Sequence, residues 1–200
     1  MWRATTGRER RAKSWWERGS SCAVGYREGD TEARDMNVLI VSVENHTTQM
    51  LEAQTDTPHL RARKLALKEL LESQLAEGKT PVILEEWSRL GMTIAHQLAC
   101  RNEPAILWRN IDMNDDERRA AGIFDEQNDR PQRPVFSEGP MPEMIRDRVP
   151  SDCIREDFFV RRILEADNGD GKVLVLLGNG HVAPVAKKLR ATGHTVSIQP

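Results

Sequence analysis

Short apolar runs alternate with segments of helical periodicity from Met36 to the end of the chain. Val38–Val43 is a continuous apolar run, which is typical of a strand buried on both faces. Further runs rich in apolar and β-branched residues predict strands at Pro81–Leu84, Ala105–Ile111, Lys172–Leu177 and Thr195–Ile198. Apolar residues three or four positions apart predict helices at Pro58–Glu77, Arg89–Arg101, Ser151–Ala166 and His181–Ala191. In the third of these helices, Ser151 is the predicted N-terminal cap and Ile154 lies on the predicted apolar side.

The order of these segments indicates the fold class. Strands and helices alternate, and this alternation is typical of an α/β protein with a mostly parallel sheet and helices on both faces. Residues 124–150 interrupt the pattern, because they hold five prolines and show no period, and they predict a long loop. We therefore expect a single α/β domain over residues 36–200.

Residues 1–35 have a different composition. Residues 1–18 contain six Lys and Arg residues but only two acidic residues, and Trp2, Trp15 and Trp16 show no periodicity. A disordered leader is the expectation, since no apolar face is present to dock the segment. The alternative is a basic, aromatic arm that contacts nucleic acid or a partner. Met36 stands directly before the first strand, so the compact protein is expected to start there.

The composition excludes several classes of protein. The 200 residues are 38% hydrophobic and carry a formal charge of −2, so no basic field draws the core to nucleic acid. The three cysteines form no CxxC pair, and no apolar run approaches the roughly 18 residues of a membrane span. A cytoplasmic protein is the expectation, with no membrane partner, and its oligomeric state is left open.

Polar residues follow the predicted strands where each strand ends. His46 follows the first strand, Glu85 and Glu86 the second, Asp112 the third and His181 the fourth. Ligands of open α/β sheets bind beyond the carboxyl ends of the strands. Imidazole and carboxylate groups suit a divalent metal, so His46, Glu85 and His181 are predicted metal ligands. Each residue could instead be an ordinary turn or helix-start residue.

Two further features bear on the chemistry of this edge. Successive strand residues point to opposite faces, so only one of Glu85 and Glu86 is expected to face the site. Arg155 shares the apolar face of its helix with Phe159 and Ile163, four and eight positions later. It is predicted either to clamp a substrate oxyanion or to form a salt bridge with Asp112 or one of the two glutamates.

The residues Gly178-Asn179-Gly180-His181-Val182-Ala183 match a dinucleotide-binding pattern, G-x-G-x-x-A. The pattern normally follows the first strand and precedes an acid by about 20 residues. Here it follows the fourth strand, and the chain ends at Pro200 without such an acid. Gly178 and Gly180 are therefore kept as candidate cofactor-binding residues, because a helix N-terminus favours an anion.

Four motifs together resemble the Tiki/TraB clan, which includes haem-binding ChaN proteins and erythromycin esterase-like enzymes. They are Val43-Glu44-Asn45-His46, Leu84-Glu85-Glu86, Arg155-Glu156-Asp157-Phe158 and Gly178-Asn179-Gly180-His181. The stretch Asp112–Ile123 is similar to a small bacterial and phage branch of that clan. The resemblance covers residues 36–200 and implies an α/β fold with a rim of His, Glu and Arg. For some relatives it also implies metal-dependent hydrolysis.

The leading hypothesis is a hydrolase that cleaves a peptide or ester bond in a small-molecule or peptide substrate. His46, one of Glu85 and Glu86, and His181 would surround a divalent metal or a reactive water, with a carboxylate as general base and Arg155 at the oxyanion. The alternative is a non-catalytic module that binds a nucleotide, haem or an anionic metabolite at the same edge.

Overall fold

The computed structural model describes residues 35–76, 82–88, 91–102, 106–129, 132–135, 143–146, 148–166 and 172–200. These residues belong to one compact unit that spans residues 33–200. The leader predicted for residues 1–35 lies, apart from Asp35, outside the described residues. Asp35 itself accepts a hydrogen bond of 2.9 Å from the backbone N–H of Thr195.

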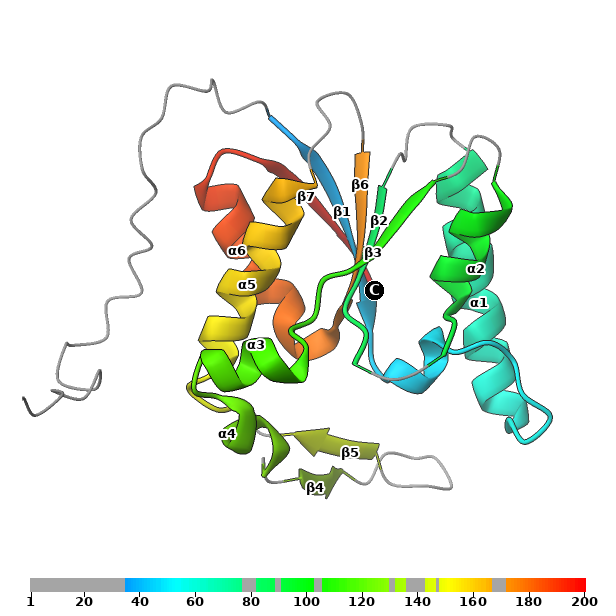
Figure 1. Cartoon of the computed structure of the whole chain (residues 1–200). Helices are drawn as coiled ribbons and strands as arrows, with labels where there is room; N and C mark the ends of the chain where they lie inside the picture. Colours follow the sequence, from blue (N-terminus) through cyan, green and yellow to red (C-terminus); the bar gives the residue numbers. More distant parts are fainter. Residues whose placement is uncertain are drawn as a thin grey trace, which may run out of the picture. The chain divides into compact units, whose positions relative to one another are not determined.

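Five parallel strands form the main sheet in the order β3-β2-β6-β1-β7, which confirms the predicted α/β fold (Figure 1). The strands are β1 (Asn37–Val43), β2 (Val82–Glu85), β3 (Leu107–Asn110), β6 (Lys172–Gly178) and β7 (Thr195–Gln199). The central strand β6 is apolar and buried from Val173 to Leu177, and it pairs with β1 on one side and β2 on the other. β7 is an edge strand, as predicted.

Helices cover both faces of this sheet, also as predicted (Figure 1). The α-helices α1 (Pro58–Ala76) and α2 (Ile94–Arg101) lie on one face, and α5 (Asp152–Glu165) and α6 (Asn179–Ala191) lie on the other. The shorter helices are the 3₁₀ helix η2 (His46–Gln49), α3 (Asp115–Ala120) and α4 (Phe124–Asn128). In the described part of the chain, no helix has the length and apolar character needed to cross a membrane.

Two apolar cores, one on each face, hold the helices against the sheet. Val38 and Ile40 of β1 pack with Phe159 of α5 and Val185 of α6 in the first core. The residues between them in β1, such as Leu39, point to the other face and pack with α1 and α2. Alternate residues of each strand therefore serve different cores, and this is why β1 and β6 read as continuous apolar runs.

Three details of the predicted helices are wrong. The helix predicted at Arg89–Arg101 begins only at Ile94, because Gly91 has φ +110° and extended Thr93 caps the helix with its side chain. Ser151 precedes α5 but makes no capping hydrogen bond with its side chain. Ile154, predicted on the apolar side of α5, is 43% exposed.

Residues 124–150 are not a structureless loop, so that prediction is also wrong. They include α4 and an antiparallel hairpin of β4 (Gln132–Val135) and β5 (Glu143–Arg146). Each of these elements has only four or five residues, too few to give a recognisable period in the sequence.

Helix α3 was not predicted, although its start carries a recognisable signal. The Asn114 side chain accepts a hydrogen bond from the Glu117 N–H, and the Glu117 side chain accepts one from the Asn114 N–H, at 2.9 Å each. This reciprocal pair is a capping box, and its N-x-x-E spacing is visible in the sequence.

The connections that follow the neighbouring strands β1 and β6 run to opposite faces of the sheet. The chain leaves β1 towards α1 on one face and leaves β6 towards α6 on the other, while the strands themselves are neighbours. Open α/β sheets bind ligands in the crevice at such a point, beyond the carboxyl ends of the strands. In this chain, that point lies beside Val43 and Gly178, which pair at the ends of β1 and β6.

Candidate functional site at the ends of β1, β2 and β6

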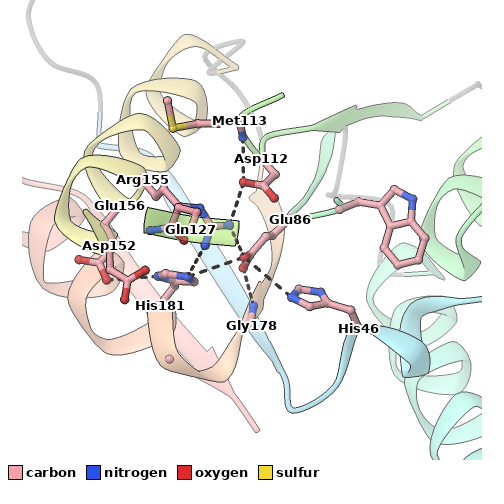
Figure 2. Close-up of polar contacts among 12 residues, drawn as sticks. His46, Glu86, Asp112, Met113, Gln127, Asp152, Arg155, Glu156, Gly178 and His181 are labelled. Atoms are coloured by element: carbon pink, nitrogen blue, oxygen red, sulfur yellow. Dashed lines mark hydrogen bonds and ion pairs between the residues drawn. The ribbon is translucent and has the colours of Figure 1, made fainter. Parts of the chain in front are cut away.

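Glu86 is the centre of a buried polar cluster at these strand ends (Figure 2). Its Oε1 accepts a hydrogen bond of 2.9 Å from Arg155 Nη2, and its Oε2 accepts one of 2.8 Å from the N–H of Gly178. The Nε2 atoms of His46 and His181 lie 3.9 and 3.8 Å from Glu86 Oε1. The structure thus brings both predicted histidines to one carboxylate.

The surroundings of Glu86 keep it ionised. Burial acts to raise its pKa, but the positive charges that His181 and His46 carry when protonated, the permanent charge of Arg155 and the N–H of Gly178 outweigh burial and lower the pKa well below the usual value for Glu. Gly178 directly precedes α6, and the N-terminus of a helix also favours a negative charge. Glu86 is therefore an anchoring anion and a weak base.

Gly178 is where the cluster leaves little room for a side chain. A Cβ at this position would lie 3.2 Å from Glu86 Oε2 and 3.4 Å from His46 Nε2. Gly180 differs, because a Cβ there would meet nothing within 4 Å. The absence of a side chain at Gly178 allows the close approach of the histidine and the carboxylate.

Replacement of Gly178 by alanine is expected to lower the free energy of unfolding by about 1–3 kcal/mol, the usual cost of overpacking. Gly180→Ala is the matched control, and its free energy of unfolding should stay unchanged or rise slightly, since alanine suits a helix better than glycine. Urea denaturation of both variants measures the difference. Equal effects of the two substitutions would contradict the role given to Gly178.

Arg155 binds the carboxylates of Glu86 and Asp112, which follow the strands β2 and β3. Its Nη2 donates to Glu86 and, at 2.8 Å, to Asp112 Oδ1, and Arg118 holds the other oxygen of Asp112 at 2.8 Å. Arg155 is only 7% exposed, and its guanidinium lies 5.3 Å from the ring centroid of Phe159. Of the salt-bridge partners predicted for Arg155, the structure provides Asp112 and Glu86.

His181 is held on both ring nitrogens. Arg155 Nη1 lies 3.2 Å from Nε2, and because a guanidinium can only donate, Nε2 accepts. The proton therefore sits on Nδ1, which donates to Glu156 Oε1 at 3.2 Å. Glu156 also pairs with Arg148 Nη2 at 2.8 Å, and Arg148 Nη1 donates to the carbonyl of Gly180. His181 is therefore buried, and both of its ring nitrogens have hydrogen-bond partners within the cluster.

His46 is the exposed member of the pair of histidines. Its side chain is 30% exposed, against 9% for His181. Nδ1 lies 2.6 Å from Gln49 Oε1, an amide oxygen that only accepts, so Nδ1 carries a proton. The lone pair of neutral His46 is then on Nε2, on the side of Glu86 and Gly178. Nε2 of neutral His46 is thus an unprotonated nitrogen on a partly exposed ring, and it can accept a proton.

Glu85 lies on the opposite face of the sheet. It is fully buried and accepts hydrogen bonds from Gln49 Nε2, Thr93 Oγ1 and Trp108 Nε1 at 2.9, 2.6 and 2.7 Å. Burial raises the pKa of Glu85 to about 7, and the three hydrogen bonds only partly oppose this rise. The prediction that only one of the two glutamates faces the histidines therefore fits the structure, and Glu86 is that residue.

The raised pKa of Glu85 gives stability a pH dependence of known sign. Between the ordinary Glu pKa and about 7, folded Glu85 holds a proton that the unfolded chain has released. This contribution to stability is full at acidic pH and is lost as the pH rises through about 7. Glu85→Gln, which carries no titrating group there, should gain stability relative to the unmodified protein from pH 5 to pH 8. Urea denaturation measures the difference in free energy of unfolding between the two proteins at each pH. The same difference at pH 5 and at pH 8 would contradict this prediction.

The donors predicted for a divalent metal already have other partners. Glu85, predicted as a ligand together with His46 and His181, lies on the opposite face of the sheet and is hydrogen-bonded to Gln49, Thr93 and Trp108. Glu86 takes its place beside the histidines, but both of its oxygens are hydrogen-bonded, and the Arg155 guanidinium contacts both Glu86 and His181 Nε2. Among the described residues, no three His, Cys, Asp or Glu side chains are grouped to hold a metal ion. A divalent cation would have to displace Arg155, so this arrangement does not fit one, and we derive no step through a metal.

The two glycines predicted to bind a cofactor are also placed. The N–H of Gly178 is donated to Glu86, so the protein's own carboxylate takes the position of an external anion at the start of α6. Gly180 has open space around it, but its carbonyl is held by Arg148. The two glycines therefore contribute to the histidine cluster, Gly178 through its N–H and Gly180 through its carbonyl.

The remaining histidines of the sequence, His59, His96 and His194, lie outside this cluster. His96 stacks on Trp108 with 4.1 Å between ring centroids, and His194 Nδ1 accepts from the N–H of Met36. His59 is exposed on α1.

Sequence reasoning gave no role to three side chains of the cluster. Gln49 lies three residues after His46, a spacing that lets the two side chains meet in the turn that follows β1. Glu156 stands directly after Arg155 and was noted only as part of a motif. Arg148 precedes α5, and nothing in the local sequence signals its contact with Glu156.

Comparison of the chain with protein-family models, curated proteins and solved structures finds no match. The resemblance to the Tiki/TraB clan therefore stays a prediction from four motifs. The case for a function rests on the cluster itself.

Proposed function

We propose that this protein is a hydrolase that cleaves an ester or peptide bond at the crevice between β1 and β6, with His46 as the general base. One observation carries the proposal: Nδ1 of His46 is fixed by Gln49, while Nε2, on a side chain that is 30% exposed, lies 3.9 Å from Glu86 Oε1 with no hydrogen bond among the described residues. A positioned imidazole of this kind can take a proton from water during attack on a carbonyl.

The proposed reaction needs only water and the substrate. The water oxygen attacks the carbonyl carbon, and its proton passes to Nε2 of His46. The carbon–oxygen or carbon–nitrogen bond then breaks, and the imidazolium returns the proton to the leaving oxygen or nitrogen. The ionised Glu86, 3.9 Å from Nε2, favours the imidazolium through its negative charge.

Arg155 takes a different role from the predicted oxyanion clamp. Both of its Nη atoms have partners, and 7% exposure leaves little of it for a substrate. In this proposal Arg155 is a positioning residue, because it holds Glu86 and His181 in place. Glu86 and His181 likewise act through their fields and contacts.

The test is an assay of the purified chain against panels of esters and peptides, before and after dialysis against a chelator. The His46→Ala variant, purified in parallel, controls for contaminating hydrolases. We expect turnover that survives chelation and is lost in the variant. Turnover that is lost on chelation and restored by a divalent metal would overturn the metal-free mechanism. No turnover on any substrate would favour the alternative, a module that binds a nucleotide, haem or an anionic metabolite.

A further inference from the structure

Glu85 has unusual partners for a buried carboxylate. It is 0% exposed, and the groups that donate to it, Gln49, Thr93 and Trp108, are all neutral. Glu86, the next residue in the chain, is instead paired with Arg155. Glu85 contacts Thr93, which caps α2, and Trp108 of β3, on the face away from the histidines. Among the described residues, Gln49 is the side chain that connects it to His46.

The amide of Gln49 has its orientation fixed by acceptors. Its Nε2 donates to Glu85 Oε1 at 2.9 Å and to the carbonyl of Glu86 at 3.2 Å. Above about pH 7, where Glu85 is ionised, a rotated amide would place Oε1 against these two oxygens with no hydrogen between them. The amide therefore keeps Nε2 towards Glu85 and Oε1 towards His46.

This orientation determines which nitrogen of His46 holds the proton. Gln49 Oε1 can only accept, and it lies 2.6 Å from Nδ1, so the neutral ring has its proton on Nδ1 and its lone pair on Nε2. Such a hydrogen bond to one ring nitrogen is what selects a histidine tautomer in proteins. With the opposite tautomer, Nε2 would carry a hydrogen and could not act as a base.

We propose that Glu85 is a positioning residue that selects the Nδ1–H tautomer of His46 from the opposite face of the sheet, through the amide of Gln49. Gln49 is itself fully buried, so solvent does not compete for its amide. The kinetic consequence rests on the proposed function, whereas the tautomer is a property of the folded protein that needs no substrate.

The test is long-range ¹H–¹⁵N NMR of the histidine side chains at a pH where His46 is neutral. We expect the unmodified protein to show the proton of His46 on Nδ1. In Glu85→Gln, one carboxylate oxygen becomes an N–H donor, so Gln49 and Trp108 can no longer both donate to residue 85. Gln49→Met removes the acceptor of Nδ1 altogether. Both variants should show a substantial population with the proton on Nε2.

Thr93→Val is the matched control. It removes another donor to the same carboxylate but leaves the contact between Gln49 and Glu85, so His46 should keep its proton on Nδ1. The exposed His59 gives an internal reference in every spectrum.

The proposal is overturned if unmodified His46 carries its proton on Nε2. It is also overturned if both test variants keep the proton on Nδ1, or if Thr93→Val changes the tautomer as much as they do. Where turnover is measurable, the turnover number of the two test variants should fall in proportion to the lost Nδ1–H population. A protein without turnover still gives the NMR result, so failure of the hydrolase proposal and failure of this one are distinguishable.

Discussion

Replacement of Arg155 by methionine is expected to lower the free energy of unfolding by about 3–5 kcal/mol, the usual cost of removing one partner from a buried ion-pair cluster. Methionine keeps an unbranched apolar stem, so the loss reports the charge. Without the guanidinium, Glu86 and Asp112 would share a buried space with less positive charge. Urea denaturation followed by circular dichroism measures the loss.

Arg161→Met on the same helix is the control for this prediction. Its side chain is 62% exposed, and a surface substitution of this kind usually changes stability by about 0.5 kcal/mol or less. Arg155→Lys keeps the charge but supplies a single ammonium in place of the guanidinium, so its loss should be intermediate. Similar losses for Arg155→Met and Arg161→Met would show that the cluster contributes little to stability.

Replacement of His46 by alanine is expected to reduce turnover by about 10²–10⁴-fold, the range for loss of a general base. Stability should change by only about 1 kcal/mol, because the ring is partly exposed and makes one close hydrogen bond, to Gln49. The turnover number and the Michaelis constant are measured with the best ester or peptide substrate. The turnover number should account for most of the loss.

His59→Ala controls for the removal of an imidazole as such, because His59 is exposed on α1 and outside the crevice. Its turnover should match that of the unmodified protein. A His46→Ala variant with full turnover would remove His46 from the mechanism, whatever the substrate.

The fold and the convergence of the two histidines could be predicted from the sequence for a physical reason. Parallel strands place their carboxyl ends at one edge, so residues that follow different strands meet there. His46, Glu86 and His181 are such residues, and in the structure the two histidines lie on either side of the Glu86 carboxylate. Arg155 could be placed as well, because a cation on the apolar face of a helix needs a buried anion.

The choice between Glu85 and Glu86 could not be predicted. A strand buried on both faces has no polar alternation, so the sequence of β2 does not indicate which face each residue takes. Arg148 and Gln49 could not be assigned roles either, because they contact the cluster from a loop and a 3₁₀ turn. Tertiary packing positions such residues, and local periodicity carries no information about it.

The place of β6 in the sheet also governs when this protein can fold during its synthesis. β1 has β6 and β7 as its neighbours, and β2 is joined to β1 only through β6. A nascent chain that has reached Glu165 therefore contains β1 without either of its partners. Non-local parallel pairing of this kind forms slowly and exposes apolar surface while it is incomplete. The ribosome must release Lys172–Gly178 before the two halves can join, so early termination should give an aggregating fragment instead of a smaller folded domain.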